Sequence, residues 1–574
     1  MGKKSMSGRK MTFLLITIPI VALFFCFNTL PLIKGVIYSF TNFKGYGSFD
    51  WVGLRNYQDL FTDSRVGGSY LFTFKLAIVA TIVTNVISLI LALGLNSKIK
   101  FKSAFRGAYF IPNVLGALVV GYIFNYFFTY ILPAFGEMLG SKTFSSSMLS
   151  STKLAWIAVV IVCAWQSIAM NTIIYISGLQ TVPEDIYEAG AIDGATGWNK
   201  FRYLTFPLII PFFSINMVLC VKNFLMVFDQ IMTLTKGGPA QSTESISYLI
   251  YNNGMSGGQF GFQSANAVIF FIVIVVISVL QMTITGKKGG TAVMEKMKIK
   301  ERVNWPVTIL LLLGLITVAF PLYMTIVIAL KKPSEMTNSI SGILSLPSHL
   351  SLDNFAEAMR VTDFWHSLGN SVFITLVTVV LSILIHSLLG YAIGRNKKSK
   401  FYKFIYFYVV SGMFVPFAIL MMPVVKQTAQ MGLANRAGVI ILYVVFYMPM
   451  NVLLYSGYLT NIPLALEEAA CVDGASTWKT YWKIVFPIMK PMHATVAVLT
   501  ALGTWNDVMT PLVIMSGSGS GNTLPLAQLN FQTQFGTNYN LAFASYLLAL
   551  LPILIFYLIC QKHILNGVVN GAVK

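Results

Sequence analysis

The chain has 574 residues, of which 56% are hydrophobic and only 10% are charged, and its formal net charge is +20. A soluble domain carries about 25% charged residues, so this composition excludes an ordinary soluble protein. Apolar runs such as residues 12–30, 76–95 and 309–330 match the roughly 20 residues that a helix needs to cross a bilayer. The alternating ten-residue strands of an outer-membrane barrel are missing from the sequence. The sequence therefore predicts an all-α, polytopic membrane protein.

Twelve hydrophobic segments divide the chain into two halves, residues 1–293 and 294–574, with six segments each. In chain order we expect transmembrane helices near residues 12–38, 70–95, 106–130, 154–180, 206–228, 264–285, 306–330, 367–394, 403–426, 438–459, 486–506 and 541–564.

Basic residues outnumber acidic residues by 40 to 20. In a soluble protein such an excess points to nucleic acid, but in a membrane protein it collects in cytoplasmic loops and orients the helices. Basic clusters precede the first segment, follow the second, and recur at the matching place in the second half: Lys3, Lys4, Arg9, Lys10; Lys98, Lys100, Lys102, Arg106; Lys397, Lys398, Lys400 and Lys403. We therefore expect no nucleic-acid partner, and a lipid-embedded chain with both termini in the cytoplasm.

The two halves share a polar loop. Residues 188–211 read Glu-Ala-Gly-Ala-Ile-Asp-Gly-Ala, a spacer and Phe-Pro-Leu-Ile-Ile-Pro, and residues 468–491 repeat this pattern at a constant offset of 280. Because both halves have the same number of spans, this is a parallel repeat, related by an axis along the membrane normal. The charge pattern places both loops in the cytoplasm. Residues 286–293 resemble the polar C-terminal tail of one subunit, and Met294 resembles the first residue of another. The chain could therefore be a natural fusion or two subunits that were linked.

Each loop follows a proline that ends a span, Pro183 or Pro463. We expect a short helix with an acidic first turn, then an Asp-Gly turn in which glycine adopts a positive φ, and then a second short segment. The segments are residues 198–205 and 478–485, and Pro207 and Pro487 begin the next spans. The loop is therefore predicted to be a compact helix-turn-helix that one partner contacts twice.

The doubled Glu-Ala-Ala-x-x-Asp-Gly-Ala pattern resembles the coupling loop of permease subunits of ABC importers. Residues 235–239 (Thr-Lys-Gly-Gly-Pro) are similar to the larger permease of the carbohydrate-uptake group, which includes the maltose importer, and residues 505–507 (Trp-Asn-Asp) to the smaller one. Gly190 departs from the alanine of the pattern, which we expect to loosen the first short helix by about 0.5–1 kcal/mol.

The resemblance implies the type I permease fold of ABC importers and a transport subunit that is not an enzyme. Two cytoplasmic ATP-binding cassette subunits would use ATP and Mg²⁺, since this chain has no GxxxxGK[ST] loop and no cofactor of its own. The residues expected to couple to them are Glu188, Ala189, Asp193, Gly194, Pro207, Glu468, Ala469, Asp473, Gly474 and Pro487.

A sugar needs hydroxyl partners, so polar residues in or next to spans are candidates for its binding site. We predict the substrate ligands Asn223, Asn266, Ser264, Asn506 and Gln166, and gate or structural roles for Lys222, Asp229 and Asp507. The long loops 230–263 and 508–540 are predicted docking surfaces for an extracellular or periplasmic solute-binding protein. The dispersed cysteines and histidines predict no metal site.

The sequence favours an oligosaccharide importer in the cell membrane but leaves alternatives. An ion-coupled secondary transporter also has two six-span halves, although it would carry its ionisable groups at the midplane. The same ABC architecture carries glycerol-phosphate or another polar solute, and Lys222 would suit an anion. A membrane-embedded enzyme lacks support, because no nucleophile–base pattern or HExxH pair is present.

Overall fold

The computed structural model describes residues 3–285, 304–335, 340–515, 519, 521–533 and 536–572. In this part of the chain ten helices are long and apolar enough to cross a membrane, or up to twelve if each of two bent pairs forms one span. The pairs are residues 400–430, bent by 99°, and residues 477–506, bent by 74°. The all-α fold with about twelve spans is therefore confirmed. The predicted boundary at residues 293 and 294 lies outside the described residues.

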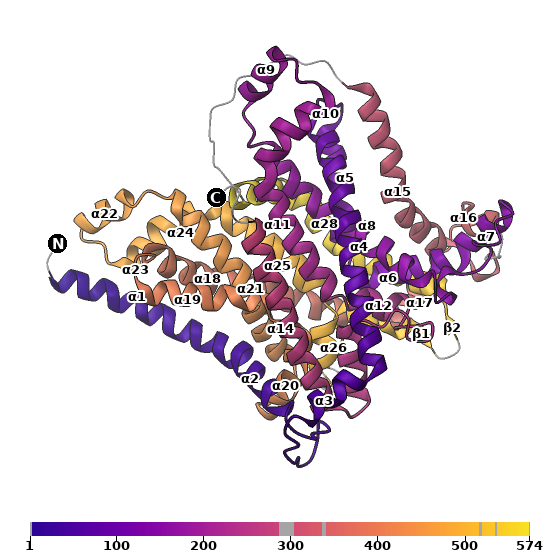
Figure 1. Cartoon of the computed structure of the whole chain (residues 1–574), viewed down its shortest axis with the longest axis horizontal. Helices are drawn as coiled ribbons and strands as arrows, with labels where there is room; N and C mark the ends of the chain where they lie inside the picture. Colours follow the sequence, from indigo (N-terminus) through magenta and orange to yellow (C-terminus); the bar gives the residue numbers. More distant parts are fainter. Residues whose placement is uncertain are drawn as a thin grey trace.

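The helices of the first half follow the predicted spans (Figure 1), except that the span expected at residues 106–130 is broken between Val114 and Ala117 and extends to Met138. They are α1 (Lys3–Phe24), α2 (Leu30–Tyr38), α3 (Arg55–Thr62), α4 (Ser64–Asn96), α5 (Lys102–Val114), α6 (Ala117–Tyr126), α7 (Leu132–Met138), α8 (Ala155–Leu179), α9 (Glu184–Ile192), α10 (Gly197–Asn199), α11 (Phe206–Leu225), α12 (Asp229–Leu234), α13 (Ile246–Tyr251) and α14 (Phe260–Thr285).

The second half repeats this order. Its elements are α15 (Trp305–Leu330), α16 (Ile340–Leu344), α17 (Asp353–Val361), α18 (Phe364–Arg395), α19 (Lys400–Ser411), α20 (Phe417–Gln430), α21 (Arg436–Tyr458), α22 (Ala465–Val472), α23 (Thr477–Thr480), α24 (Phe486–Ile488), α25 (Lys490–Asn506), α26 (Met509–Met515), α27 (Leu524–Ala527), the strands β1 (Gln532–Thr533) and β2 (Gly536–Thr537), and α28 (Tyr539–Ala572).

Each half has the same helical core. In the first half α4 packs against α8 and α11, and in the second α18 packs against α21 and α25. Tyr175 and Tyr455, which are 280 residues apart, are both fully buried in these cores. Gly390 lets α18 approach α21 closely, because a Cβ at this position would lie 2.5 Å from the Cβ of Tyr455. Small residues at such crossings are typical of packed membrane helices.

The first span of each half reaches across to the other half. The α1–α2 span packs against α18 and α20 of the second half as well as α14 of its own, and Gln427 donates to the Cys26 carbonyl at 2.8 Å. The α15 span packs against α28 of its own half and against α4 and α5 of the first, where the Tyr109 hydroxyl of α5 donates to the Leu311 carbonyl at 2.7 Å. Each first span therefore joins the two halves.

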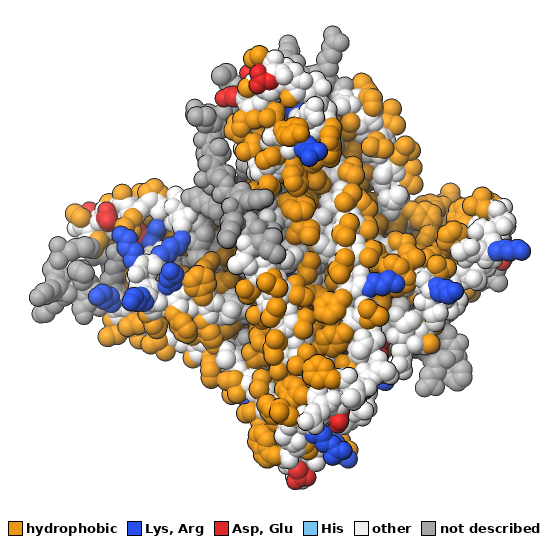
Figure 2. Space-filling model, in the orientation of Figure 1, with side chains coloured by type: hydrophobic (Ala, Val, Ile, Leu, Met, Phe, Trp, Pro, Cys, Tyr) orange, Lys and Arg blue, Asp and Glu red, His pale blue; other side chains and the backbone are white. Residues whose placement is uncertain are grey.

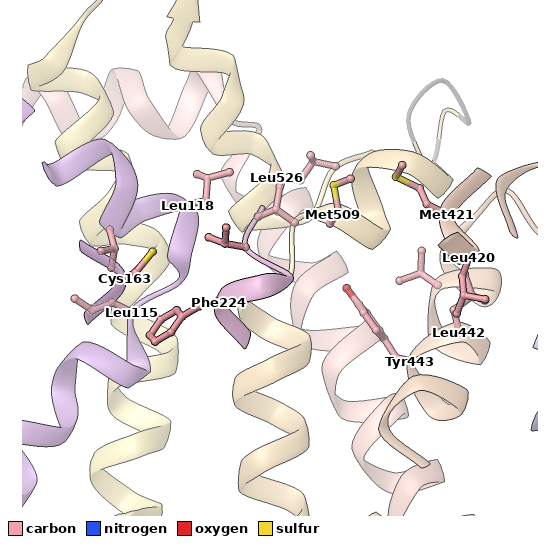
Figure 3. Packing of buried hydrophobic residues seen from close by; sticks show 14 of the residues in the cluster. Leu115, Leu118, Cys163, Phe224, Leu420, Met421, Leu442, Tyr443, Met509 and Leu526 are labelled. Atoms are coloured by element: carbon pink, nitrogen blue, oxygen red, sulfur yellow. The ribbon is translucent and has the colours of Figure 1, made fainter. Parts of the chain in front are cut away.

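The hydrophobic core is continuous across the two halves. Figure 3 shows Leu115, Leu118 and Phe224 of the first half near Met509 and Leu526 of the second. Apolar side chains also cover most of the visible surface (Figure 2), which is the pattern of helices that face lipid.

Candidate functional site

The two repeated loops form the tips of two separate arms. In Figure 1 α9 lies at the top of the molecule and α22 at the far left. Each short helix follows a span and its proline, Pro183 after α8 and Pro463 after α21, as the sequence predicts. Proline at these places ends the preceding helix because it excludes the helical conformation from the residue before it.

The turn at the end of each short helix has the same geometry. Gly194 has a φ of +77° and Gly474 a φ of +78°, in the left-handed region that favours glycine. The residue that follows donates back across the turn, from Ala195 to the Gly190 carbonyl at 2.7 Å and from Ala475 to the Ala470 carbonyl at 2.9 Å. This closure satisfies carbonyls that the helix end leaves without partners. The predicted helix-turn-helix is confirmed in both copies.

The outer faces of the two loops match residue by residue. Glu188, Ala189 and Asp193 are exposed, and so are Glu468, Ala469 and Asp473. The sequence reasoning missed the apolar members of this face. They are Ile192 and Val472, which are 87% and 88% exposed, and Trp198 and Trp478, which are 66% and 48% exposed. The sequence does contain a signal for these residues, because the two members of each pair stand 280 residues apart, as in the rest of the repeat. Large exposed apolar groups at a fixed place indicate an interaction surface.

Gly190 does not interrupt the first short helix. The helix α9 runs through this position, and a Cβ at Gly190 would lie 2.3 Å from a terminal methyl carbon of Leu204. In the second loop Ala470 occupies the matching place and is buried. The loosening expected from glycine stays a prediction, and the Leu204 side chain fills the space that a methyl group at Gly190 would take.

The second loop is attached to the membrane core by a buried ion pair. The Nε of Arg395, the last residue of α18, donates to Glu467 of α22 at 2.5 Å. The side chains of these two residues are only 9% and 2% exposed. The same guanidinium donates to the carbonyls of Leu459 and Ile462 at 3.1 and 3.0 Å, and the Tyr391 hydroxyl donates to Glu467 at 2.9 Å. The sequence reasoning selected Glu468 and missed this pair.

The first loop has neutral groups at the matching places. Tyr187 stands 280 residues before Glu467, and Leu95 stands 300 residues before Arg395. The Tyr187 hydroxyl bonds to that of Thr205 at 3.2 Å, and the Lys200 ammonium lies 4.3 Å from the centre of the tyrosine ring. Among the described residues, no carboxylate of α9 forms an ion pair.

A group of amide side chains surrounds the break between α5 and α6. Asn506 donates to the Val114 carbonyl at 2.9 Å, and Gln166 donates to the Leu115 carbonyl at 3.0 Å. Gln230 in turn donates to the side-chain oxygen of Gln166 at 2.9 Å. A helix end leaves such carbonyls without backbone partners, so these amides stabilise the break. Asn506 makes its bond from the second half to the first.

Two carboxylates stand beside these amides. Asp507 accepts from the Tyr443 hydroxyl at 2.9 Å and from the backbone of Met509 and Thr510 at 3.1 and 3.2 Å, so it caps α26. Asp229 begins α12, the corresponding helix of the first half. The central polar cluster is defined by Gln166, Asp229, Gln230, Tyr443, Asn506 and Asp507. In Figure 3 Tyr443 projects toward the region between Phe224 and Leu420.

The other predicted ligands lie elsewhere. Asn223 is exposed and Lys222 is half-buried, both on α11. Ser264 donates to the Phe260 carbonyl at 2.8 Å, and Asn266 accepts from Tyr70 at 3.2 Å. Ser264 and Asn266 are thus buried with partners in α14 and α4, so the structure does not place them in the central polar cluster.

The predicted docking loop after α11 is fixed by a hydrogen bond within the loop and by an ion pair to α4. Thr243 donates to the Gly238 carbonyl at 2.5 Å, and Arg65 of α4 pairs with Glu244 at 2.7 Å. Lys236 and Gln241 remain exposed on this loop. The second docking loop, residues 508–540, is described only in part. In the described parts of the chain, no three His, Cys, Asp or Glu residues are grouped as metal ligands.

The family model of the binding-protein-dependent transport system inner membrane component matches residues 84–288 and again residues 386–569. These two matches cover well over half of the chain. The chain belongs to this family. It is a multi-pass permease of a transport system, not an enzyme, and it carries two permease domains in one polypeptide. The first spans, α1–α2 and α15, lie outside both matches.

Curated relatives of this permease each correspond to about half of its length. The multiple sugar-binding transport system permease protein MsmG of Streptococcus mutans serotype c is 39% identical over 48% of this chain and 100% of the relative. MsmF of the same organism is 41% identical over 48% of this chain and 94% of the relative. A solved bacterial alginate ABC transporter, in complex with a pentasaccharide-bound periplasmic protein, covers 48% of this chain and 94% of its own at 20% identity and a TM-score of 0.42.

Proposed function

We propose that this permease forms the translocation path of an ATP-driven importer for an oligosaccharide. Two ATPase subunits in the cytoplasm dock on the repeated loops, and both chain termini lie on that side of the membrane. The observation that carries this proposal is the matched outer face of the loops. Both copies present an exposed glutamate, an exposed aliphatic residue and an exposed tryptophan at positions 280 residues apart.

The two loops suit paired ATPase subunits because a parallel repeat presents the same surface twice. The exposed aliphatic and tryptophan side chains are suited to an apolar cleft, and Glu188 and Glu468 to basic groups at its rim. When the ATPase subunits close on ATP, they draw the loops together and open the path outward. The domains 1–293 and 294–574 act as the two moving halves.

The sugar as substrate is supported by the names of the relatives and by the chemistry of the central polar cluster. Amide groups donate hydrogen bonds to hydroxyls and accept hydrogen bonds from them, and carboxylates accept them, as a sugar site requires. Gln166, Asn506 and exposed Asn223 are the proposed ligands nearest the path, with Asn266 and Ser264 in supporting positions. Glycerol-phosphate is the weaker candidate, because the names of the relatives point to sugars.

A solute-binding protein outside the cell delivers the substrate to the loops 230–263 and 508–540. The test reconstitutes the full chain in liposomes with its cognate ATPase subunits and binding protein, and measures uptake of labelled oligosaccharides. Uptake that requires internal ATP and all three components supports the proposal. Uptake driven by an ion gradient without the ATPase subunits would instead identify a secondary transporter.

The contribution of the cluster is tested with alanine at Gln166 and at Asn506. We expect reduced uptake with ATPase subunits still bound, because the substituted groups lie away from the loops. Alanine at Gln58, an exposed amide of α3 with no proposed role in the path, provides the comparison. Unchanged uptake kinetics in the Gln166 and Asn506 variants would remove the cluster from the path.

A further inference from the structure

We propose that Arg395 and Glu467 are positioning residues that make the second repeated loop move as one body with α18. A displacement of this loop by the ATPase is thereby transmitted directly to the spans of the second half. The first repeated loop lacks this connection. The inference depends on the proposed coupling function. It adds that the two loops transmit movement differently, because only the second is attached to its span by an ion pair.

The guanidinium of Arg395 joins three elements. Its Nε binds Glu467 in α22, and its two terminal nitrogens bind the carbonyls of Leu459 and Ile462, in the segment between α21 and α22. A planar guanidinium fixes such partners in direction as well as distance, which a lysine cannot do. The loop, the end of α21 and the end of α18 are therefore tied at one point.

The environment of the pair makes this connection difficult to break. Both side chains are nearly inaccessible, and the Tyr391 hydroxyl occupies the second oxygen of Glu467. Removing one partner of a buried pair leaves the other charge uncompensated, which is strongly unfavourable. The loop thus cannot slide over α18 without separating two buried charges.

The contact at the base of the first loop is of another kind. Leu95 is buried among apolar residues that Tyr187 packs against, and the Tyr187 hydroxyl bonds within its own loop. Apolar contacts have no preferred direction, so they permit sliding that a hydrogen-bonded ion pair prevents. The two loops hence share an outer face but differ in how they are attached.

The test measures loop movement by double electron–electron resonance in the complex of the full chain with its ATPase subunits. In a background without native cysteines, spin labels at Ala465→Cys and Leu376→Cys report on α22 against α18. Labels at Asp185→Cys and Ile78→Cys report on α9 against α4. All four positions are exposed, and none belongs to the outer face proposed to dock on the ATPase. Each pair is measured without nucleotide and after trapping with ATP and vanadate.

We expect one narrow distance between α22 and α18 in both states of the otherwise unchanged protein. Arg395→Met broadens this distribution and shifts its mean on trapping, and it lowers coupled ATPase activity by about tenfold. Arg395→Lys keeps the charge and restores part of the narrow distribution. The matched variant Tyr187→Phe leaves the distance between α9 and α4 as it was.

A wild-type distribution in both states of Arg395→Met would overturn the inference. If that variant does not assemble, Tyr391→Phe removes one hydrogen bond to Glu467 and is expected to broaden the same distribution by a smaller amount; no broadening would also overturn it. A third label pair, Asp185→Cys with Ala465→Cys, tests the proposed function separately. If these two loops do not approach each other on trapping, the coupling function itself fails.

Discussion

The two repeated loops are alike where they face outward and different where they meet the membrane core. Glu188 and Glu468 are exposed at matching places, whereas Tyr187 and Glu467, one residue earlier, have different chemistry and different partners. The surface offered to a partner has therefore stayed the same in both copies while the attachment has diverged. Two loops can therefore share the same surface for a partner and still be attached to the membrane helices in different ways.

The spans that follow the two loops also differ between the halves, because one is continuous and the other is bent. The first half continues from residue 197 to Leu225 as one span, whereas the second bends by 74° between α24 and α25. His493 stabilises this bend by donating to the Phe486 carbonyl at 2.9 Å and accepting from the Tyr455 hydroxyl at 2.9 Å. The first half has Phe213 at this position. The second loop is thus firmly joined to α18 but separated by a bend from α25.

The largest effect is expected from reversing the charge of both outer faces. Glu188→Lys combined with Glu468→Lys should abolish stimulation of the ATPase by the loaded binding protein, a loss of about a hundredfold, because like charges across an interface cost several kcal/mol. The ATPase activity of the reconstituted complex measures this. Glu184→Lys is the control, since this exposed residue has Leu464 at the matching place. Full coupling in the double variant would refute the assignment of the loops.

A sharper comparison places one charge in the apolar part of each face. Ile192→Asp and Val472→Asp should each weaken binding of the ATPase subunits by about 1–2 kcal/mol, since a truncated interface residue of this kind commonly costs more than 1 kcal/mol. Titration of the ATPase subunits against the permease in nanodiscs gives both affinities, with Ile192→Leu as the control. Effects of very different size would show that the outer faces are not equivalent.

The attachments are compared by removing one hydroxyl from each. Tyr391→Phe should destabilise the protein by about 1–3 kcal/mol, because Glu467 loses a partner in a buried place. Tyr187→Phe should cost less than about 1 kcal/mol, because its half-exposed hydroxyl can bond to water instead. Thermal unfolding of the two variants in the same detergent measures the difference. Equal losses would contradict the asymmetry of the attachments.

The smallest effect concerns the helices of the loops. Ala470→Gly should destabilise α22 by about 0.5–1 kcal/mol through backbone entropy. Gly190→Ala should be close to neutral, since the gain in helix propensity is offset by the displacement of Leu204. Hydrogen exchange of the two short helices checks this pair. A clear loss of protection in α9 of Gly190→Ala would show that Leu204 cannot move.

The spans and the repeated loops could be predicted because both leave local signals in the sequence. Apolar runs of sufficient length mark the helices, and Asp193-Gly194 and Asp473-Gly474 mark the turns. The break at Leu115 and Gly116 was not predicted, although Pro112, Asn113 and Gly116 are local signals of a helix break. Its stabilisation by Asn506 from the other half depends on tertiary packing that the sequence does not reveal. The contacts of the first spans with the opposite half likewise depend on packing between distant residues.

Some residues escaped attention although a signal existed. Glu467 and Arg395 differ in character from their counterparts in the first half, so a search for mismatches between the copies would have found them. Asn56 and Asn354 are, in contrast, equivalent residues of the two halves whose similarity was overlooked. Asn56 donates to the carbonyls of Ser39 and Thr41 after the first span, and Asn354 binds the end of α15 in the same way.

The contacts that α1–α2 and α15 make with the opposite half bear on how such a permease is made. Either half synthesised alone would lack these contacts until the other half arrived. Joining the two in one polypeptide sets their ratio at one to one and raises their effective concentration to the millimolar range typical of short tethers. Once assembled, the interlocked helices should hold the two halves together even after the peptide chain between them is cut.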